Sequence, residues 1–115
     1  MPILVRDARA DDLAPIVAFN ALLALETEHK TLDPEVLAKG VARALADPER
    51  LRYWVAIDDE SNRVVGQVAT SREWSDWRDG WVWWFQSVFV DAEFRGRGVF
   101  RRLHAHVRDL ARADP

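Results

Sequence analysis

The sequence predicts an α/β (α+β) domain whose elements follow the order β-α-α-β-β-β-α. Three observations lead to this prediction. Apolar residues recur at helical spacing in two stretches between residues 13 and 45, and strand-like apolar runs then continue to residue 90. A glycine-rich turn then opens a last amphipathic stretch. With 115 residues, the chain is expected to form a single domain over residues 1–115.

A short strand and two helices are expected first. Ile3–Arg6 predicts the strand, and Asp11 or Asp12 can cap a helix that continues to about residue 28. Asp33-Pro34-Glu35 predicts the start of the second helix, because it places an N-cap, a proline at the first helical position and an acid in the first turn. Asp47-Pro48 is expected to end that helix, since a proline disfavours helical backbone at the residue before it.

A hairpin follows the second helix. Arg52–Ile57 and Val64–Ser71 are both strand-like, and the polar residues 58–62 between them predict a turn. The two strands are therefore expected to pair with each other. Glu73–Gly80 is expected to be a loop that leads into the next strand.

The next strand, Trp81–Val90, is apolar at nearly every position. Apolar residues on both alternating faces predict a central strand that is covered on both sides. Gln86 and Ser87 interrupt this run, and a polar break there indicates either a bulge or a cleft. Val99–Ala113 then predicts the final amphipathic helix.

Composition excludes several classes of protein. The net charge of only −3 argues against a broad nucleic-acid or membrane role. No apolar stretch approaches the ~20 residues of a membrane span, and the first residues lack the pattern of a signal peptide. The absence of cysteine removes disulfides, thiolate metal sites and thiol nucleophiles. A cytoplasmic protein is the resulting expectation.

Six tryptophans stand in this short chain, and five of them lie between Trp74 and Trp84. Large aromatic side chains dominate the energetics of both cores and interfaces. Two interpretations therefore stay open: a core built on tryptophan, or tryptophans that line a substrate cleft.

The turn at Arg95–Gly98 is the strongest candidate for a functional site. It connects an apolar strand to a helix, and the first turn of a helix has unpaired N–H groups that bind anions. Gly96 and Gly98 allow a close approach of the backbone to such an anion. Cations at a helix N-terminus are unfavourable without an anion, and four occur here: Arg95, Arg97, Arg101 and Arg102. The alternative is a solvated basic turn.

Other readings of the glycine-rich turn are disfavoured. No Gly-Lys-Ser/Thr is present, so the turn is not a P-loop. It contains no Gly-x-Gly-x-x-Gly and does not follow the first strand, and both observations argue against a dinucleotide-binding fold. An RNA-binding role for Arg-Gly-Arg-Gly beside tryptophans conflicts with the acidic balance of the chain.

The segment from Val88 to Val99 resembles the acetyl-CoA-binding segment of the GNAT acyltransferases. That family's pattern is Arg/Gln-x-x-Gly-x-Gly/Ala after an apolar strand and a short acidic-aromatic lead-in. Arg95 matches its first position and Gly98 its central glycine, while Phe100 replaces the usual small final residue. The order of the elements also matches the first two-thirds of that fold, which has a mostly antiparallel sheet.

The resemblance implies an N-acetyltransferase that moves an acetyl group from acetyl-CoA to a primary amine of a small molecule or peptide. It implies that the pantetheine arm pairs with the backbone of Val88, Phe89 and Val90 like an added strand, that backbone amides of the turn hold the pyrophosphate, and that no metal is needed. The implied cofactor-binding residues are Val88, Phe89, Val90, Arg95, Gly96, Arg97, Gly98, Val99, Phe100 and Arg101.

The resemblance also implies C-terminal parts that lie beyond the final helix. In the family a further strand, a helix and a hairpin follow, with a tyrosine that protonates the departing thiolate. Tyr53 does not match that position. The alternative to an active enzyme is therefore a catalytically incomplete, CoA-binding or structural fragment. An uncovered apolar strand over residues 81–90 would also favour a homo-oligomer.

Candidates for the amine site are less specific. Glu26, Glu28 and Glu73 could each act as a base or bind the amine, or they could be solvated surface acids. Three further residues are candidates for substrate binding: Trp74, Trp77 and Gln86. His104 and His106 lie two apart on a helix, so a joint metal site is not expected.

Overall fold

A computed structural model describes residues 2–114 of the chain. Its elements are β1 (Ile3–Asp7), α1 (Leu13–Glu28), α2 (Pro34–Ala46), β2 (Arg52–Asp58), β3 (Arg63–Ser75), β4 (Gly80–Val90) and α3 (Val99–Ala113), with short 3-10 turns at Ala10–Asp12 and Ala92–Phe94. The expected order of strands and helices is confirmed.

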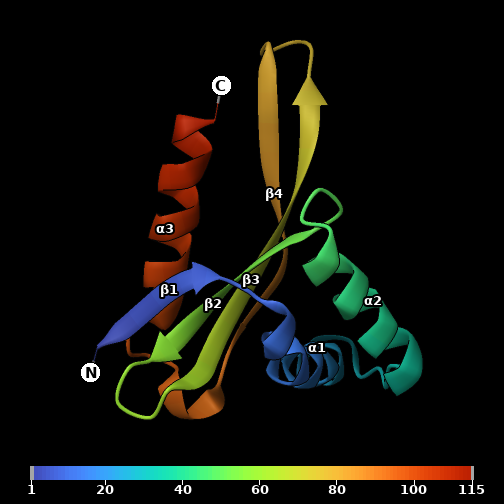
Figure 1. Ribbon diagram of the computed structural model, residues 1–115, viewed down its shortest axis with the longest axis vertical. Helices are drawn as coiled ribbons and strands as arrows, with labels where there is room; N and C mark the ends of the chain where they lie inside the picture. The colour runs from blue at the N-terminus through green and yellow to red at the C-terminus, as the bar shows by residue number, and fades with distance from the viewer. Residues whose placement is uncertain (1, 115) are drawn as a thin grey trace.

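The strands form one antiparallel sheet over the described residues, in the order β1-β2-β3-β4. Figure 1 shows α3 on one face of this sheet and α1 with α2 on the other, while the far part of the β3–β4 hairpin extends past the helices. Alternate residues of each strand point to opposite faces, so the sheet separates two apolar clusters.

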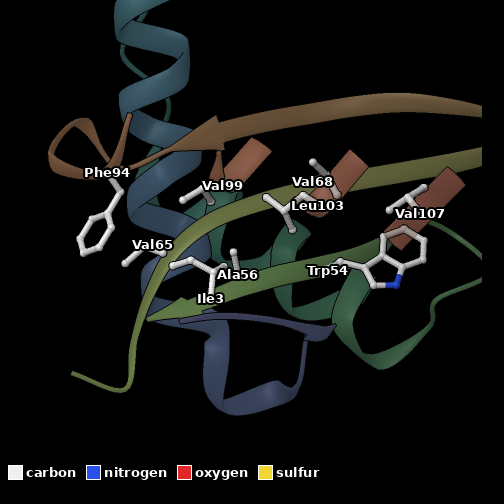
Figure 2. Packing of buried hydrophobic residues seen from close by; sticks show 9 residues of the cluster. All are labelled: Ile3, Trp54, Ala56, Val65, Val68, Phe94, Val99, Leu103 and Val107. Carbon is white, nitrogen blue, oxygen red and sulfur yellow. The ribbon is translucent and has the colours of Figure 1, made fainter. Parts of the chain in front are cut away.

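The first cluster lies between α3 and the sheet. Figure 2 shows its buried members, which are Ile3, Trp54, Ala56, Val65, Val68, Phe94, Val99, Leu103 and Val107. Gly66 allows the start of α3 to approach β3 closely, because a Cβ atom at this position would lie 2.9 Å from Val99 Cγ1. The close approach fixes where the helix N-terminus stands beside the end of β4.

The second cluster lies between the sheet and the helices α1 and α2. Ile16 of α1 and Val41 of α2 are buried against Val55 of β2. The predicted start of α2 is confirmed, since the Asp33 carboxylate accepts hydrogen bonds from the amides of Glu35 (2.9 Å) and Val36 (3.3 Å). No helix among residues 2–114 is long and apolar enough to cross a membrane.

The expected cap of α1 is wrong in its detail. Asp12 precedes α1 without capping it, and its buried carboxylate binds the Arg6 guanidinium at 2.7 and 3.0 Å and the Arg9 amide at 2.7 Å. Burial raises the pKa of Asp12, but the hydrogen bonds from Arg6 and the Arg9 amide outweigh it and hold the pKa below its usual value. The residue therefore fastens β1 to the start of α1.

The expected loop at Glu73–Gly80 is also wrong. Strand β3 continues to Ser75 and β4 begins at Gly80, so that only residues 76–79 form the turn. Trp74 lies directly opposite Trp81, and their rings meet edge to face with centroids 5.3 Å apart. Cross-strand aromatic pairs of this kind stabilise paired strands, which explains why the hairpin extends further than the polar residues suggested.

Gln86 marks a β-bulge, one of the two outcomes expected for the polar break. Ala69 lies opposite Ser87 while the next residue, Thr70, lies opposite Phe85, so Gln86 is the extra residue. The bulge divides β4 into a hairpin half, Gly80–Phe85, and a cradle half, Ser87–Val90. We use these two names below.

The prediction that this strand is central and covered on both sides is wrong for the described residues. β4 lies at the sheet edge, and its hairpin half is largely uncovered. Trp54 alone among the tryptophans is fully buried, and Trp83 stacks on it with ring centroids 6.0 Å apart. The others are 41–96% exposed: Trp74, Trp77, Trp81 and Trp84. The interpretation that the core is built mainly on tryptophan is therefore wrong.

Candidate functional site

The glycine-rich turn forms a concave site at the N-terminus of α3. Gly96 and Gly98 have φ angles of +78° and +81°, a left-handed conformation that side chains with a Cβ rarely adopt. The first α-helical bond runs from the Arg102 amide to the Gly98 carbonyl (3.1 Å), so the amides of the first helical turn precede it and have no helical acceptor. They are therefore available to an anion.

A pocket of about 330 Å³ lies over this helix start. Its lining residues are Val90, Phe94, Arg95, Gly96, Gly98, Val99, Phe100 and Arg101. Seven of these eight belong to the cofactor-binding set that the resemblance implied, and Phe94 is the addition. The fold thus brings together the end of β4, the glycine turn and the first turn of α3.

Arg97 lies beside this pocket rather than among its lining residues. Its guanidinium stands over the Phe94 ring, 5.3 Å from the centroid. Phe94 is buried, so the Arg97 guanidinium covers part of a buried ring. A phosphate-binding role for Arg97 stays a prediction.

The outer edge of the cradle half offers backbone groups to a ligand. The Asp91 amide donates to the Val65 carbonyl (2.8 Å), and hydrogen-bonded and non-bonded pairs alternate along antiparallel strands. In the register Gly66–Val90, Gln67–Phe89 and Val68–Val88, the alternation therefore directs the amides and carbonyls of Val88 and Val90 away from β3. Within the described residues no strand pairs with this edge.

Phe89 has a different role from its two neighbours. The same alternation directs its backbone towards β3. Its buried side chain packs against Phe19 of α1, with ring centroids 5.1 Å apart. Of the three residues expected to pair with a pantetheine arm, only Val88 and Val90 present their backbone groups outward.

Arg95 connects three parts of the site. Its Nε donates to the Val90 carbonyl (2.9 Å), and its Nη2 lies 3.0 and 3.4 Å from the two carboxylate oxygens of Glu26 in α1. The guanidinium also stands over the Phe89 ring, 5.1 Å from its centroid. Glu26, expected as a candidate base, is thus engaged with the first residue of the glycine motif, a contact that sequence spacing could not reveal.

The face of the hairpin opposite α3 holds two of the remaining candidates. Trp83 and Phe85 point to the α3 side, where Phe85 stacks on His104 with centroids 5.5 Å apart. By alternation Trp84 points to the other side, as does Ser71, which lies opposite it. Gln86 joins this face through a hydrogen bond from its Nε2 to Ser71 Oγ (2.9 Å).

Glu73 shares this face, two residues along β3 from Ser71. Trp74 points to the α3 side, and Trp77 lies in the hairpin turn at 96% exposure. The structure therefore groups Glu73 and Gln86 and separates them from Trp74 and Trp77. Trp84 and Ser71 complete the group, and only the register around the bulge identifies them. Glu28 is exposed at the end of α1 and shares no contact with this face in the described residues.

A buried polar network stands behind the bulge. Ser87 Oγ donates to Asn20 Oδ1 (2.9 Å) and accepts from Gln67 Nε2 (3.0 Å). Asn20 Nδ2 donates to the Tyr53 hydroxyl (3.1 Å). Burial raises the pKa of Tyr53 above its ordinary value, against the lowering effect of its hydrogen bonds. The network ties α1, β2, β3 and β4 together where β4 changes its register.

No metal site was found among the described residues, where no three His, Cys, Asp or Glu side chains are grouped to hold an ion. A pocket of about 530 Å³ lies at the other end of α3. Its charges are already paired with each other: Arg72 binds Asp114 (3.1 Å) and Arg52 binds Asp7 (3.1 Å). It is remote from the glycine turn.

Comparison with known proteins identifies the class of protein that has this fold and this turn: it is an acyltransferase. The model of the acetyltransferase (GNAT) family matches residues 18–114. The chain therefore belongs to the GNAT acetyltransferase family, as the resemblance had implied. No match was found among curated proteins.

Solved structures agree with this assignment. A possible acetyltransferase from Clostridium difficile 630 is 43% identical with a TM-score of 0.90, over 99% of this chain and 74% of that one. A Trypanosoma brucei acetyltransferase is 20% identical (TM-score 0.71, 97% and 76% covered). A ribosomal-protein-alanine N-acetyltransferase from Brucella melitensis biovar Abortus 2308 is 16% identical (TM-score 0.77, 98% and 74% covered). The last two similarities show the fold alone.

Proposed function

We propose that this acetyltransferase takes its acetyl group from acetyl-CoA and transfers it to a primary amine of a small molecule or peptide. The observation on which the proposal rests is the helix start with two left-handed glycines beside the open edge of β4. This combination suits a ligand that joins a polyphosphate to an amide-bearing chain, which is the chemistry of coenzyme A.

The chain's own groups fit the two parts of the donor. The amides of Val99 and its neighbours at the helix start would hold the pyrophosphate, with Arg101 close by in the lining of the pocket. The pantetheine amides would pair with the outward groups of Val88 and the outward amide of Val90. The Val90 carbonyl is already occupied by Arg95. Bound acetyl-CoA supplies the thioester carbonyl that the amine attacks, releasing CoA as a thiol.

The amine would approach across the face formed by Ser71, Glu73, Trp84 and Gln86. This face meets the cradle half at the bulge, where the outward backbone edge begins. Amines are protonated near neutral pH, so the acceptor must lose a proton before it attacks. Glu73, directly or through a water molecule, is the carboxylate placed to accept that proton on this face, and the Trp84 ring can hold a cation.

The alternative function is binding of CoA without turnover. It is favoured by the position of Tyr53, whose hydroxyl is buried in the Asn20 network away from the outward edge of β4. No other tyrosine is present in the chain to protonate a leaving thiolate. Release of CoA from acetyl-CoA, measured across small amines and short peptides, separates the two: steady turnover supports transfer, and its absence despite binding supports the alternative.

The test of the donor site is thermal stabilisation by acetyl-CoA. We expect acetyl-CoA to raise the Tm of the wild-type protein, since a ligand that binds only the folded state stabilises it. Gly98→Glu should abolish the effect, because it places bulk and a negative charge in the anion site. Equal shifts in the two proteins would refute the assignment.

Gly98→Ala provides the matched control. A Cβ atom at Gly98 meets nothing within 4 Å, so alanine brings only the strain of the +81° φ angle, about 1 kcal/mol. The Ala variant should therefore lose some stability and keep a response to acetyl-CoA, and the Glu variant should lose the response. If both lose it equally, backbone conformation rather than anion binding explains the glycine.

A further inference from the structure

We propose that Glu26 is a positioning residue of the donor site: it acts through Arg95, and holds that arginine at the mouth of the pyrophosphate pocket. The proposal rests on the proposed binding of a CoA donor, and assigns Glu26 a role different from that of a base. The observations behind the proposal are the contacts of the Arg95 guanidinium group.

The Arg95 guanidinium is fixed from three directions. Nε donates to the Val90 carbonyl (2.9 Å), Nη2 meets both oxygens of the Glu26 carboxylate (3.0 and 3.4 Å), and the plane stands over the Phe89 ring. A guanidinium has five N–H donors in a rigid fork. Two directions of the fork are thus taken by protein acceptors, and no acceptor among residues 2–114 is recorded for the Nη1 donors of this pocket-lining residue.

The Glu26–Arg95 pair contributes little to the stability of the fold. The side chains are 45% and 46% exposed, and exposed ion pairs of this kind stabilise proteins only weakly. Its effect is on geometry, because the pair connects α1 to the turn of the glycine motif, 69 residues later in the chain. A long, flexible arginine beside an anion site would otherwise sample many orientations, and fixing one of them reduces the entropy lost on binding.

The position of Arg95 also defines where the added strand of the ligand ends. The Val90 carbonyl is one of the outward groups of the cradle half, and Arg95 occupies it. A pantetheine arm can therefore pair with Val88 and the Val90 amide, beyond which it meets the guanidinium and the pocket. Glu26 keeps this boundary in place. With both its oxygens facing a cation, it is also poorly placed to take the proton of an amine.

The test measures binding of coenzyme A itself, by calorimetry, to the full chain and to four variants. Glu26→Ala should raise the Kd about threefold, and Arg95→Ala should raise it more. The double variant should bind no more weakly than Arg95→Ala alone, because Glu26 has no effect once its partner is missing. Glu28→Ala is the matched control: it removes an exposed acid two residues along α1 and should leave the Kd unchanged.

Two further readouts separate positioning from general charge or folding effects. Glu26→Gln keeps an oxygen that accepts from Arg95, so it should restore most of the wild-type affinity. The Arg95 Nε–H resonance in NMR spectra should be protected from exchange in wild type and lose protection in Glu26→Ala. Equal Tm values for Glu26→Ala and wild type without ligand would confirm that the fold is intact.

The proposal is overturned if Glu26→Ala binds coenzyme A as tightly as wild type, which would mean that the acid has no role in binding, or more tightly, which would mean that it only repels the phosphates. It is also overturned if the effects of the two single variants add in the double variant. Failure of wild type itself to bind coenzyme A would refute the proposed donor site together with this role. Binding by wild type with additive effects would refute this role alone.

Discussion

The two halves of strand β4 have similar apolar sequences and very different surroundings. In the cradle half, Ser87 and Phe89 are buried, and Val88 and Val90 pack against the α3 cluster. In the hairpin half, Trp81, Trp84 and Phe85 are 41–52% exposed. Helices pack on both faces of the cradle half, whereas of the described helices only α3 contacts the hairpin half, through His104 and Phe85, and the tip of the hairpin extends past the helices (Figure 1).

The difference shows that an apolar run does not by itself say which of its residues are buried. The cradle half is packed on both faces, because α1 and α3 lie against it and Gly66 lets α3 approach closely. The hairpin half is held by its pairing with β3 and by contacts on one face, such as the indole of Trp83 that donates to Asp114 (2.8 Å). A strand packed on both faces suits a ligand site, and exposed aromatic surface suits a contact with another surface.

The largest loss of stability is expected from a substitution of Asp12, which lies outside β4. This substitution should weaken both halves of β4 together. Asp12→Asn removes the charge that pairs with Arg6 and should cost about 2–3 kcal/mol of unfolding free energy at pH 7. The native pKa of Asp12 is lowered, so its contribution is complete above the unfolded value of about 3.9 and is lost as the pH falls through the native value. Urea unfolding of both proteins at pH 7 and pH 3 measures this.

The gap between wild type and Asp12→Asn should therefore be wide at pH 7 and narrow at pH 3. Tryptophan emission reports mainly on the hairpin half, and acetyl-CoA binding reports on the cradle half. The native tryptophan emission and the binding of acetyl-CoA should both be lost at the same urea concentration. Separate transitions would show that the halves of β4 unfold independently, which would make the contrast between them sharper than we infer.

The second prediction compares Gly66 of β3, which pairs with the cradle half, with Gly80, which belongs to the hairpin half. A Cβ at Gly66, opposite Val90, would lie 2.9 Å from Val99 Cγ1, whereas a Cβ at Gly80 would approach only the Arg78 carbonyl at 3.8 Å. Gly66→Ala should lower the unfolding free energy by about 1–2 kcal/mol and weaken acetyl-CoA binding, because it moves the N-terminus of α3. Gly80→Ala should change neither by more than about 0.5 kcal/mol. Equal effects would contradict the contrast in packing.

The third prediction concerns the hairpin half. A substitution there should change the stability of the fold least, and should instead change how the protein self-associates. We propose that a second copy of the chain pairs with its open β4 edge. Five aromatics of the β3–β4 hairpin and its turn are 41–96% exposed: Trp74, Trp77, Trp81, Trp84 and Phe85. At roughly 100 Å² each they offer roughly 500 Å² a side, so a two-fold pairing would bury about 1,000 Å², the lower limit for a specific interface.

Size-exclusion chromatography with light scattering should detect this dimer, and tryptophan emission should shift on dilution. Trp84→Lys should yield a monomer with the unfolding free energy changed by less than about 0.5 kcal/mol, because lysine on an edge strand opposes pairing. Phe100→Lys, an exposed aromatic beside the cradle, should leave the dimer intact. A monomer with dilution-independent emission at every concentration would eliminate the edge as an interface.

Local chemistry made most of the fold predictable. The Asp33-Pro34-Glu35 start and the polar turn at residues 58–62 each determine local backbone, and the structure contains both features. The extension of the hairpin to Ser75 and Gly80 depends instead on the Trp74–Trp81 pair. That contact exists only after the strands have paired, so the polar residues around it predicted a loop.

The glycine turn was predictable for a similar reason, because positive φ angles and a helix N-terminus follow from neighbouring residues. The surrounding contacts were not. The Glu26–Arg95 pair joins residues 69 positions apart, and the sharing of one face by Glu73, Trp84 and Gln86 depends on the bulge. The spacing of residues along the chain does not determine such long-range contacts.

The bulge at Gln86 has a consequence for how this strand can change during evolution. Upstream of it the odd-numbered residues Trp83 and Phe85 face α3, and downstream the even-numbered Val88 and Val90 do. Loss of this single residue would exchange the two faces of the hairpin half without altering its composition. Insertions and deletions should therefore accumulate in descendants at the turn of residues 76–79, while the length of the segment from Gly80 to Val90 stays constant.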